Sequence, residues 1–143
     1  KIDFNYKESF DVRSTILLNG ACNHLRLAKN NFLNMGTFLY SFFDMDKKEL
    51  LQKENDPECH YFSPIRFINK DFPPSVIVEG SKDPLAPESR DFSELLNKLD
   101  IKNIHLKANG LIGIHGFCIA AKTKEGKRLF EKSLEFIEKT SEK

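Results

Sequence analysis

The sequence predicts an α/β fold in which parallel strands alternate with crossover helices. Short apolar runs are separated by longer segments whose apolar residues recur at helical spacing. Strands joined through helices run parallel, because the helix returns the chain to the same end of the sheet. The 143 residues, 40% of them hydrophobic, suit one ordinary domain or part of a larger one. Only three strands are expected, and such a sheet would expose an edge, so we expect an incomplete fold.

The first half of the chain is expected to hold one strand and a helical segment. Residues 14–20 form a short apolar run that ends in Asn19-Gly20, which predicts a buried strand closed by a turn. Residues 25–55 hold too many apolar side chains at helical spacing for a solvated helix, so they are expected to pack on another layer. These apolar positions are Leu25, Leu27, Phe32, Leu33, Phe38, Leu39, Phe42 and Phe43. Ser63-Pro64 disfavours a helix at that point.

The second half alternates between strands and helices. Residues 75–80 are rich in β-branched side chains and end in glycine, which predicts a strand. Pro87 and Glu88 suit the first turn of a helix. Residues 101–107 predict another strand, and a glycine-bearing loop at 109–113 leads to a final helix over 123–139. Candidate core contacts of that helix are Leu129, Phe130, Leu134, Phe136 and Ile137.

Charge and cysteine content argue against several classes of protein. The net charge is +1 with both signs interspersed, whereas a nucleic-acid binder needs a basic face. No apolar run approaches the ~20 residues that span a bilayer. Three cysteines without CxxC spacing, and four histidines without HxxxH spacing, support neither a metal nor a cofactor. We expect Cys22, Cys59 and Cys118 to be small buried or half-buried thiols. The alternative is one disulfide bond plus one free thiol. The first residue is Lys1, which suggests a processed or truncated chain.

Two residues carry the chemistry that the sequence suggests. Asp83 lies in a Gly-Ser-Lys-Asp turn directly after the strand at 75–80, and His115 follows the next strand along the chain. Catalytic groups gather at the carboxyl ends of strands in open α/β sheets. A carboxylate there can hold an imidazole through its Nδ1–H, and an imidazole suits a general base that later acts as an acid. We therefore predict Asp83 and His115 as catalytic residues.

Each of these residues also has a simpler interpretation. Asp83 alone could cap the turn before Pro84, and a lone histidine is more often buried and satisfied by the backbone. His24, His60 and His105 are assigned to that interpretation or to the surface. No Gly-x-Ser-x-Gly occurs in the chain, and Ser81 lacks the flanking glycines of such a motif. The sequence thus supplies an acid and a base without a nucleophile.

The order of the two motifs carries a resemblance to a known family. An acid turn after one strand and a His-Gly-Phe segment after the next, with a helix between them, follow the order Ser, Asp, His of α/β-hydrolases. The chain resembles the C-terminal half of an α/β-hydrolase-fold esterase or lipase of the hormone-sensitive-lipase and carboxylesterase kind. The segments that carry the likeness are 63–65, 72–85, 109–117 and 123–139, and more weakly 16–23.

The resemblance implies a fold, a division of the chain and an activity. It implies that 1–143 is the C-terminal portion of one α/β-hydrolase domain and that 25–60 is a cap insert over the substrate. Asp83 becomes the triad acid and His115 the base of a carboxylic ester hydrolase. The serine and the oxyanion loop would come from an N-terminal half, in an upstream segment or a companion chain. Without them this chain should be inactive, because removing one triad member costs orders of magnitude.

Other functions stay open at this point. A serine peptidase or an arylformamidase-like amidase would show a similar acid turn and histidine. A non-catalytic relative that binds a small molecule or a protein is a second possibility, and an unrelated small α/β domain is a third. In the cap segment, Phe32, Phe38, Tyr40, Phe42 and Phe43 could line an acyl or aryl pocket, although plain helix packing explains them more simply.

Overall fold

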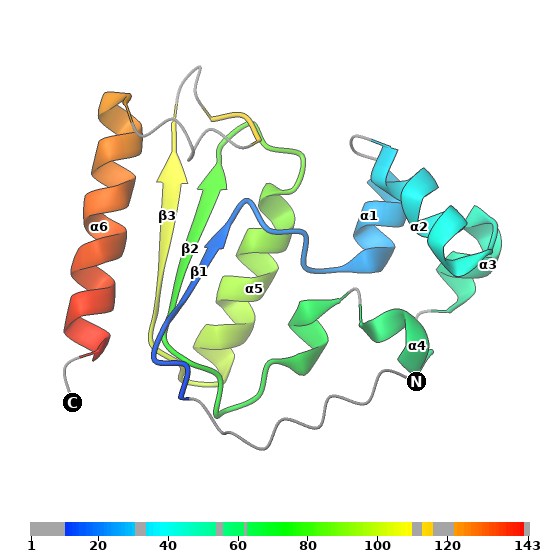
Figure 1. Ribbon diagram of the computed structural model, residues 1–143, viewed down its shortest axis with the longest axis horizontal. Coiled ribbons are helices and arrows are strands. Elements are labelled where there is room, and N and C mark those ends of the chain that lie inside the picture. Colours follow the sequence, from blue (N-terminus) through cyan, green and yellow to red (C-terminus); the bar gives the residue numbers. More distant parts are fainter. Residues whose placement is uncertain are drawn as a thin grey trace.

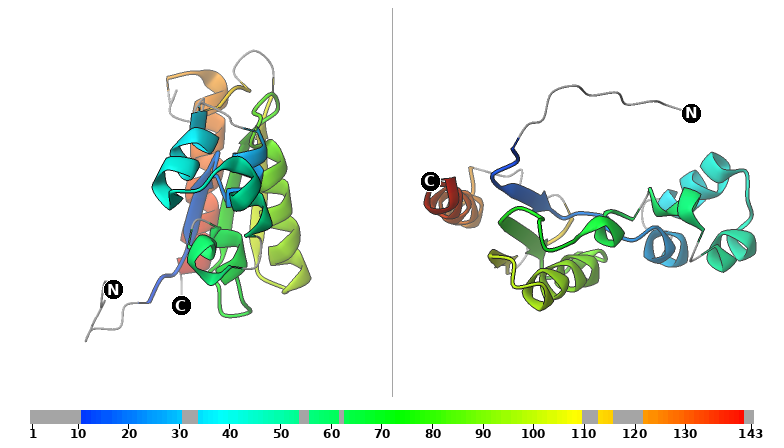
Figure 2. Two further views of the ribbon diagram at one scale, coloured as in Figure 1. Left: turned by 90° about the vertical axis from the view of Figure 1, so that its right-hand side faces the viewer. Right: turned by 90° about the horizontal axis from the view of Figure 1, so that it is seen from below.

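A three-stranded parallel sheet with a helix on each face forms the body of the protein. The computed structural model describes residues 11–30, 34–53, 56–61, 63–109, 113–115 and 122–141. The strands are β1 (Thr15–Leu18), β2 (Ser75–Gly80) and β3 (Asn103–Ala108), in the order β1-β2-β3. Helix α5 (Ala86–Lys98) covers one face of the sheet and helix α6 (Lys124–Ser141) the other (Figure 1; Figure 2, right).

The strands pair as their sequence predicts. Residues Thr15 to Leu18 of β1 lie beside Ser75 to Val78 of β2, and all six residues of β2 lie beside β3. Strand β2 is buried along its whole length, as its β-branched composition indicates. The predicted parallel strands with a crossover helix are confirmed, with boundaries shifted by one or two residues at β1 and β3.

The core has one apolar layer on each side of the sheet. On the α6 side it contains Val76, Val78, Ala108, Leu129 and Phe136. On the α5 side it contains Cys22, Ile77, Phe92, Leu96 and Ile101. Fully burying one large aliphatic or aromatic side chain contributes about 1.5–3 kcal/mol, so these two layers hold the helices on the sheet. They also fix where the strands end, which sets the position of the loops that follow them.

Two expectations about burial are wrong. Ile16 and Leu18 were expected in a buried strand, yet they are 47% and 50% exposed. Phe130 and Leu134 of α6 were candidate core contacts and are also exposed. Ile16 and Leu18 pair with Val76 and Val78 and so share the α6 face, but α6 packs over β2 and β3. These four side chains are 41–60% exposed, and we call them the β1–α6 apolar patch.

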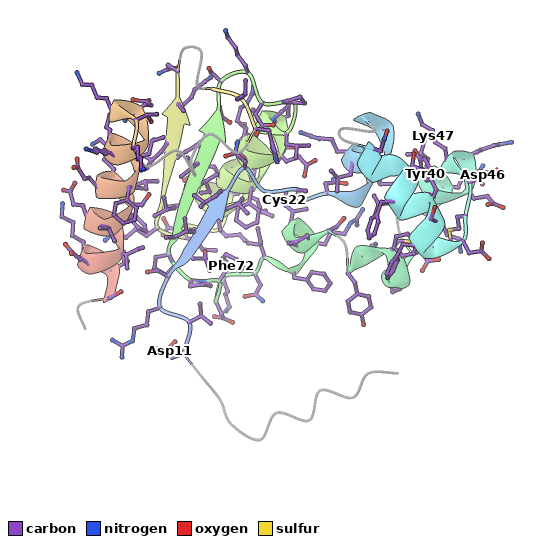
Figure 3. All side chains as sticks on the ribbon, turned by 45° about the horizontal axis from the view of Figure 1, so that its top comes forward. Asp11, Cys22, Tyr40, Asp46, Lys47 and Phe72 are labelled. Carbon is purple, nitrogen blue, oxygen red and sulfur yellow. The ribbon has the colours of Figure 1, made fainter. Side chains whose placement is uncertain are left out.

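A helical lobe, residues 24–60, extends from the sheet on the side away from α6 (Figures 1 and 3). It contains α1 (His24–Asn30), α2 (Met35–Phe43), α3 (Lys47–Gln52) and α4 (Pro57–His60), and the short 3-10 turn η2 (Pro64–Phe67) leads back to the sheet. The predicted helical segment is therefore three helices, and a fourth follows it. Its buried cluster consists of Leu27, Ala28, Leu39, Leu50, Cys59 and Leu85. Leu85 belongs to the turn after β2, so the lobe is packed against that turn.

Local bonds explain how the lobe is held together. The Tyr40 hydroxyl donates to the Ala28 carbonyl oxygen at 2.7 Å and joins α2 to α1. Asp46 caps α3, because its side chain accepts from the Glu49 N–H at 2.8 Å while the Glu49 carboxylate accepts from the Asp46 N–H (Figure 3). Phe38 and Phe42, which were expected to pack, are exposed. Phe32 and Leu33 lie outside the described residues.

Candidate active site

Asp83 lies in a tight turn at the carboxyl end of the central strand. Its backbone N–H donates to the Gly80 carbonyl at 3.0 Å, which closes the turn. The neighbouring Ser81 N–H donates to the Ala108 carbonyl at 2.9 Å and ties the turn to the end of β3. The carboxylate accepts from the Leu85 N–H through Oδ1 at 2.8 Å. Asp83 is only 5% exposed, so its charge lies in a poorly solvated place where polar partners have a large effect.

The structure brings His115 to this carboxylate. His115 Nδ1 lies 3.1 Å from Asp83 Oδ2, and the imidazole keeps 34% of its surface exposed. The loop before it is held down because the Lys82 N–H donates to the Gly113 carbonyl at 2.7 Å. The other histidine-loop residues, 110–112 and 116–121, lie outside the described residues, and the predicted Gly116-Phe117 is among them.

Two glycines allow the histidine loop to approach the acid turn so closely. A Cβ added to Gly80 would overlap the backbone of Gly113, with the Gly113 carbonyl carbon at 2.8 Å and the Ile114 carbonyl oxygen at 3.0 Å. A Cβ on Gly113 would in turn meet the Ser81 side chain and lie 3.0 Å from the Ala108 carbonyl oxygen. A backbone cannot yield as a side chain can, so both positions need glycine for steric reasons.

Asn19 is a third polar side chain at this site, and sequence reasoning missed it as such. Its Nδ2 donates to Asp83 Oδ2, the same oxygen that faces His115. Asn19 ends β1 with a positive φ of 49° and is buried. The sequence signal was the Asn19-Gly20 pair, which was interpreted only as a turn. The partner, Asp83, is 64 positions away in the sequence, and the pairing of the strands brings the two residues together.

A second buried carboxylate joins the start of α5 to the segment that follows β1. Glu88, in the first turn of α5, accepts from the backbone N–H groups of Cys22 and, at 2.9 Å, Asn23. Burial raises the pKa of Glu88, and these two hydrogen bonds oppose that shift. Burial, together with the Glu88 and Asp91 charges, raises the pKa of the Cys22 thiol to about 12. A thiol with so high a pKa is protonated at neutral pH, which excludes Cys22 as a thiolate nucleophile.

The remaining histidines and cysteines play other parts. His105 Nε2 lies 3.1 Å from Glu79 Oε2, in a cluster that also brings Arg90 and Lys107 to 3.5 Å from that buried carboxylate. Cys22 and Cys59 are buried, as expected, and Cys118 lies outside the described residues. Within the described ranges, no group of three or more potential metal ligands gathers. No described helix is long and apolar enough to cross a membrane.

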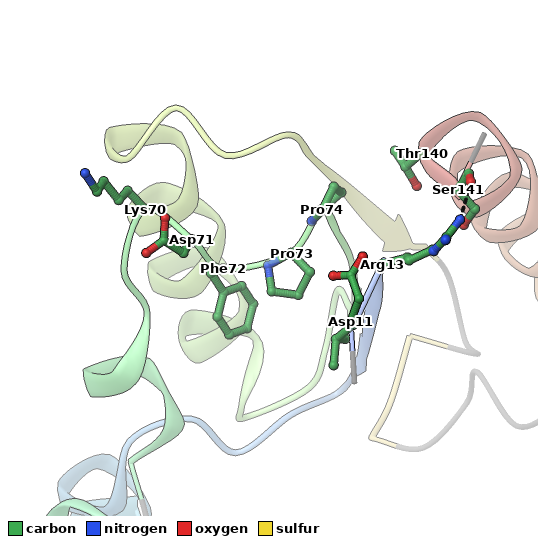
Figure 4. A pocket seen from close by; sticks show the side chains of 10 residues that line it. Asp11, Arg13, Lys70, Asp71, Phe72, Pro73, Pro74, Thr140 and Ser141 are labelled. Carbon is green, nitrogen blue, oxygen red and sulfur yellow. Dashed lines mark hydrogen bonds between the residues drawn. The ribbon is translucent and has the colours of Figure 1, made fainter. Parts of the chain in front are cut away.

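The pocket in Figure 4 lies far from Asp83. It has a volume of about 210 Å³ and is lined by residues 11–13, 70–74 and 140–141. These residues surround the amino-terminal ends of β1 and β2, whereas Asp83 follows the carboxyl end of β2. Arg13 Nη1 donates to the Ser141 carbonyl at 3.2 Å across it and joins the start of the described chain to the end of α6 (Figure 4).

Comparison with solved structures identifies the fold. The esterase of Pyrobaculum calidifontis superimposes with a TM-score of 0.61 at 21% identity, over 91% of this chain and 44% of that one. Esterase B of Lactobacillus rhamnosus HN001 superimposes with a TM-score of 0.67 at 13% identity, over 92% of this chain and 42% of that one. No family model and no curated protein sequence matches the chain. The α/β-hydrolase fold is thereby confirmed, and the chain spans less than half the length of these esterases.

Proposed function

We propose that this chain supplies the acid and the base of a serine-dependent carboxylic ester hydrolase. The observation that carries the proposal is the buried Asp83 carboxylate with Oδ2 at 3.1 Å from His115 Nδ1, at the carboxyl edge of a parallel sheet. A carboxylate in that position selects the imidazole tautomer with hydrogen on Nδ1 and leaves Nε2 as the base. The likeness to esterase structures supports the ester class.

The proposed reaction is acyl transfer to serine and then to water. The serine Oγ attacks the ester carbonyl carbon while His115 Nε2 takes the hydroxyl proton, and Asp83 stabilises the resulting imidazolium. The imidazolium then gives its proton to the leaving alkoxide, so an alcohol departs and an acyl-serine remains. Water attacks the acyl carbon with the same proton transfers and releases the carboxylic acid. Asp83 orients the imidazole and does not itself take up the proton, while Asn19 and Leu85 donate hydrogen bonds to its carboxylate.

The serine and the oxyanion donors are proposed to lie in a segment or chain outside this sequence. The outer edge of β1 has no partner strand among the described residues, and the side chains of the β1–α6 apolar patch are about half exposed. Exposed strand edges and contiguous apolar surface mark places where another element packs. A further parallel strand beside β1 would end close to Asn19, and its carboxyl end would then lie near Asp83 and His115.

We further propose that residues 25–60 form part of a cap over the substrate. The support is their position, because Leu85, two residues after Asp83, packs in the buried cluster of the helical lobe. The exposed rings of Phe38 and Phe42, with centroids 6.0 Å apart, are candidate contacts for an acyl or aryl group. A serine peptidase or amidase would use the same acid and base, so substrate hydrolysis rather than the triad must separate these classes.

The first experiment is fluorophosphonate labelling of the purified protein followed by the intact mass of every polypeptide in it. A labelled second or longer polypeptide is expected, because the reagent reacts with an activated serine. His115→Gln should abolish that label, whereas His105→Gln, the matched change at a histidine paired with Glu79, should retain it. A preparation without label on any polypeptide contradicts catalysis and favours the non-catalytic relative.

A further inference from the structure

Asn19 contacts the same carboxylate oxygen as the histidine. Asp83 Oδ2 receives Asn19 Nδ2 and faces His115 Nδ1, while Oδ1 receives the Leu85 N–H. An ionised carboxylate only accepts hydrogen bonds, so the asparagine must present its NH₂ group. From this geometry we infer that Asn19 is a positioning residue, which fixes the Asp83 carboxylate so that Oδ2 faces the imidazole. The inference rests on the proposed function only in giving that alignment a catalytic purpose.

The backbone gives Asn19 a rigid base. Its N–H donates to the Val78 carbonyl at 3.0 Å, which continues the pairing of β1 with β2 by one residue. Its φ of 49° lies in the left-handed region, which asparagine tolerates better than most residues. A buried side chain on a backbone held in this way has little freedom to turn. Its amide can therefore act as a fixed anchor rather than as an adjustable surface contact.

The two anchors explain why the carboxylate keeps one orientation. Leu85 binds one oxygen and Asn19 the other, so rotation of the carboxylate about its terminal torsion would break both hydrogen bonds. That torsion is otherwise broad for aspartate. His115, by contrast, is partly exposed and sits on a loop, so it cannot define the geometry by itself. Without the Asn19 amide, Oδ2 keeps only its contact with the partly exposed His115, and the bond to Nδ1 loses its fixed partner.

The test measures which ring nitrogen of His115 carries the proton in the 143-residue chain, from imidazole ¹⁵N shifts assigned with His115→Gln. The wild-type chain should show the Nδ1–H tautomer, which the Asp83 hydrogen bond selects. Asn19→Gly removes the amide without backbone strain, and the isosteric Asn19→Asp replaces the donor by an acceptor. Each should raise the ratio of the Nε2–H to the Nδ1–H tautomer by about threefold or more. The reason is that the hydrogen bond from His115 Nδ1–H to Asp83 Oδ2, which favours the Nδ1–H tautomer, is weakened.

Two controls separate positioning from a general effect on folding. Asn34→Gly makes the same substitution at an exposed asparagine with φ of 59° outside the site, and it should leave the tautomer ratio of His115 unchanged. Asp83→Ala should abolish the preference for Nδ1–H, and adding Asn19→Gly to it should change nothing further, because Asn19 acts through Asp83. A cooperative thermal unfolding transition shows that each variant is folded. If Asn19→Gly does not fold, Asn19→Asp is used for the comparison instead.

Three results would overturn the inference: a wild-type His115 without the Nδ1–H tautomer, no change of tautomer in a folded Asn19 variant, or an equal change in the Asp83→Ala background. The test does not depend on turnover. A chain that shows the expected coupling but never yields a labelled serine would refute the proposed hydrolase and keep the positioning role. In an active hydrolase, Asn19→Gly should lower kcat with little effect on KM.

Discussion

The close contact between the acid turn and the histidine loop can be tested by a single methyl group. In Gly80→Ala the new Cβ would lie 2.8 Å from the Gly113 carbonyl carbon, whereas an ordinary contact needs about 3.5 Å. The obstacle is backbone, so the histidine loop must retreat by roughly 0.7 Å or more. That movement strains the bond from the Lys82 N–H to the Gly113 carbonyl, which is 2.7 Å long.

The cost has two parts. Weakening one partly buried hydrogen bond contributes about 0.5–1.5 kcal/mol, and overpacking contributes about 1–3 kcal/mol. We therefore expect Gly80→Ala to lower the free energy of unfolding by about 2–4 kcal/mol. His115 Nδ1 lies 3.1 Å from Asp83 Oδ2. The same retreat would lengthen this distance beyond the range of about 2.7–3.2 Å that is usual for N–H···O hydrogen bonds. The Nδ1–H tautomer should then lose population.

Urea denaturation measures the first effect, with the slope checked to be unchanged, and imidazole ¹⁵N shifts measure the second. Gly20→Ala is the matched control for stability. The three atoms nearest to its new Cβ all belong to the side chain of Leu17, which can shift more readily than backbone. The control should therefore cost less stability than Gly80→Ala. If Gly80→Ala is as stable as the wild type and His115 keeps its tautomer, the steric reasoning about the loop is refuted.

Three further predictions concern the acid–base pair, the second buried carboxylate and the helical lobe. In the complete hydrolase, Asp83→Asn should lower the rate of ester hydrolysis by about 10⁴, with His115→Gln at least as severe, measured as kcat on an aryl ester. The raised pKa of Glu88 means that the folded state gains most from this group below its unfolded pKa and loses that gain as pH rises. Glu88→Gln should therefore flatten the rise in stability towards acid pH, and an unchanged curve in urea denaturation would contradict this. Asp46→Ala should lower stability by about 0.5–2 kcal/mol through the lost cap, whereas the exposed neighbour Lys47→Ala should stay within about 0.5 kcal/mol.

The sequence was sufficient to predict the strands, their parallel pairing and the places of Asp83 and His115 after two successive strands, but not that the two side chains are in contact. The carboxyl ends of neighbouring parallel strands lie at one edge of a sheet, so residues that follow two such strands are brought together by topology alone. Asn19 directly follows β1, the remaining strand of the sheet, and lies at the same edge for the same reason. It escaped notice because an Asn-Gly pair after a strand is also the ordinary signal of a turn.

Burial could not be predicted in the same way. An apolar run predicts that a strand has apolar side chains to bury, but it does not say which segment covers them, and Ile16 and Leu18 are about half exposed in the described part of the chain. Glu79 shows the opposite case. A charged residue at the end of an apolar strand gave no sign of burial, yet Arg90 and Lys107 place positive charge 3.5 Å from its carboxylate, and His105 Nε2 lies 3.1 Å from Oε2.

The exposed surface and the candidate site lie on the same strand, and this links stability to chemistry. Strand β1 presents Ile16 and Leu18 along its length and Asn19 at its carboxyl end. A parallel strand paired with its outer edge would cover backbone groups that are unpaired among the described residues, and would end beside the Asp83 carboxylate. In the proposed hydrolase, the segment that completes the sheet is therefore also the one placed to deliver the nucleophile to His115. Completion of the fold and completion of the triad would then be a single event, because β1 and Asn19 take part in both.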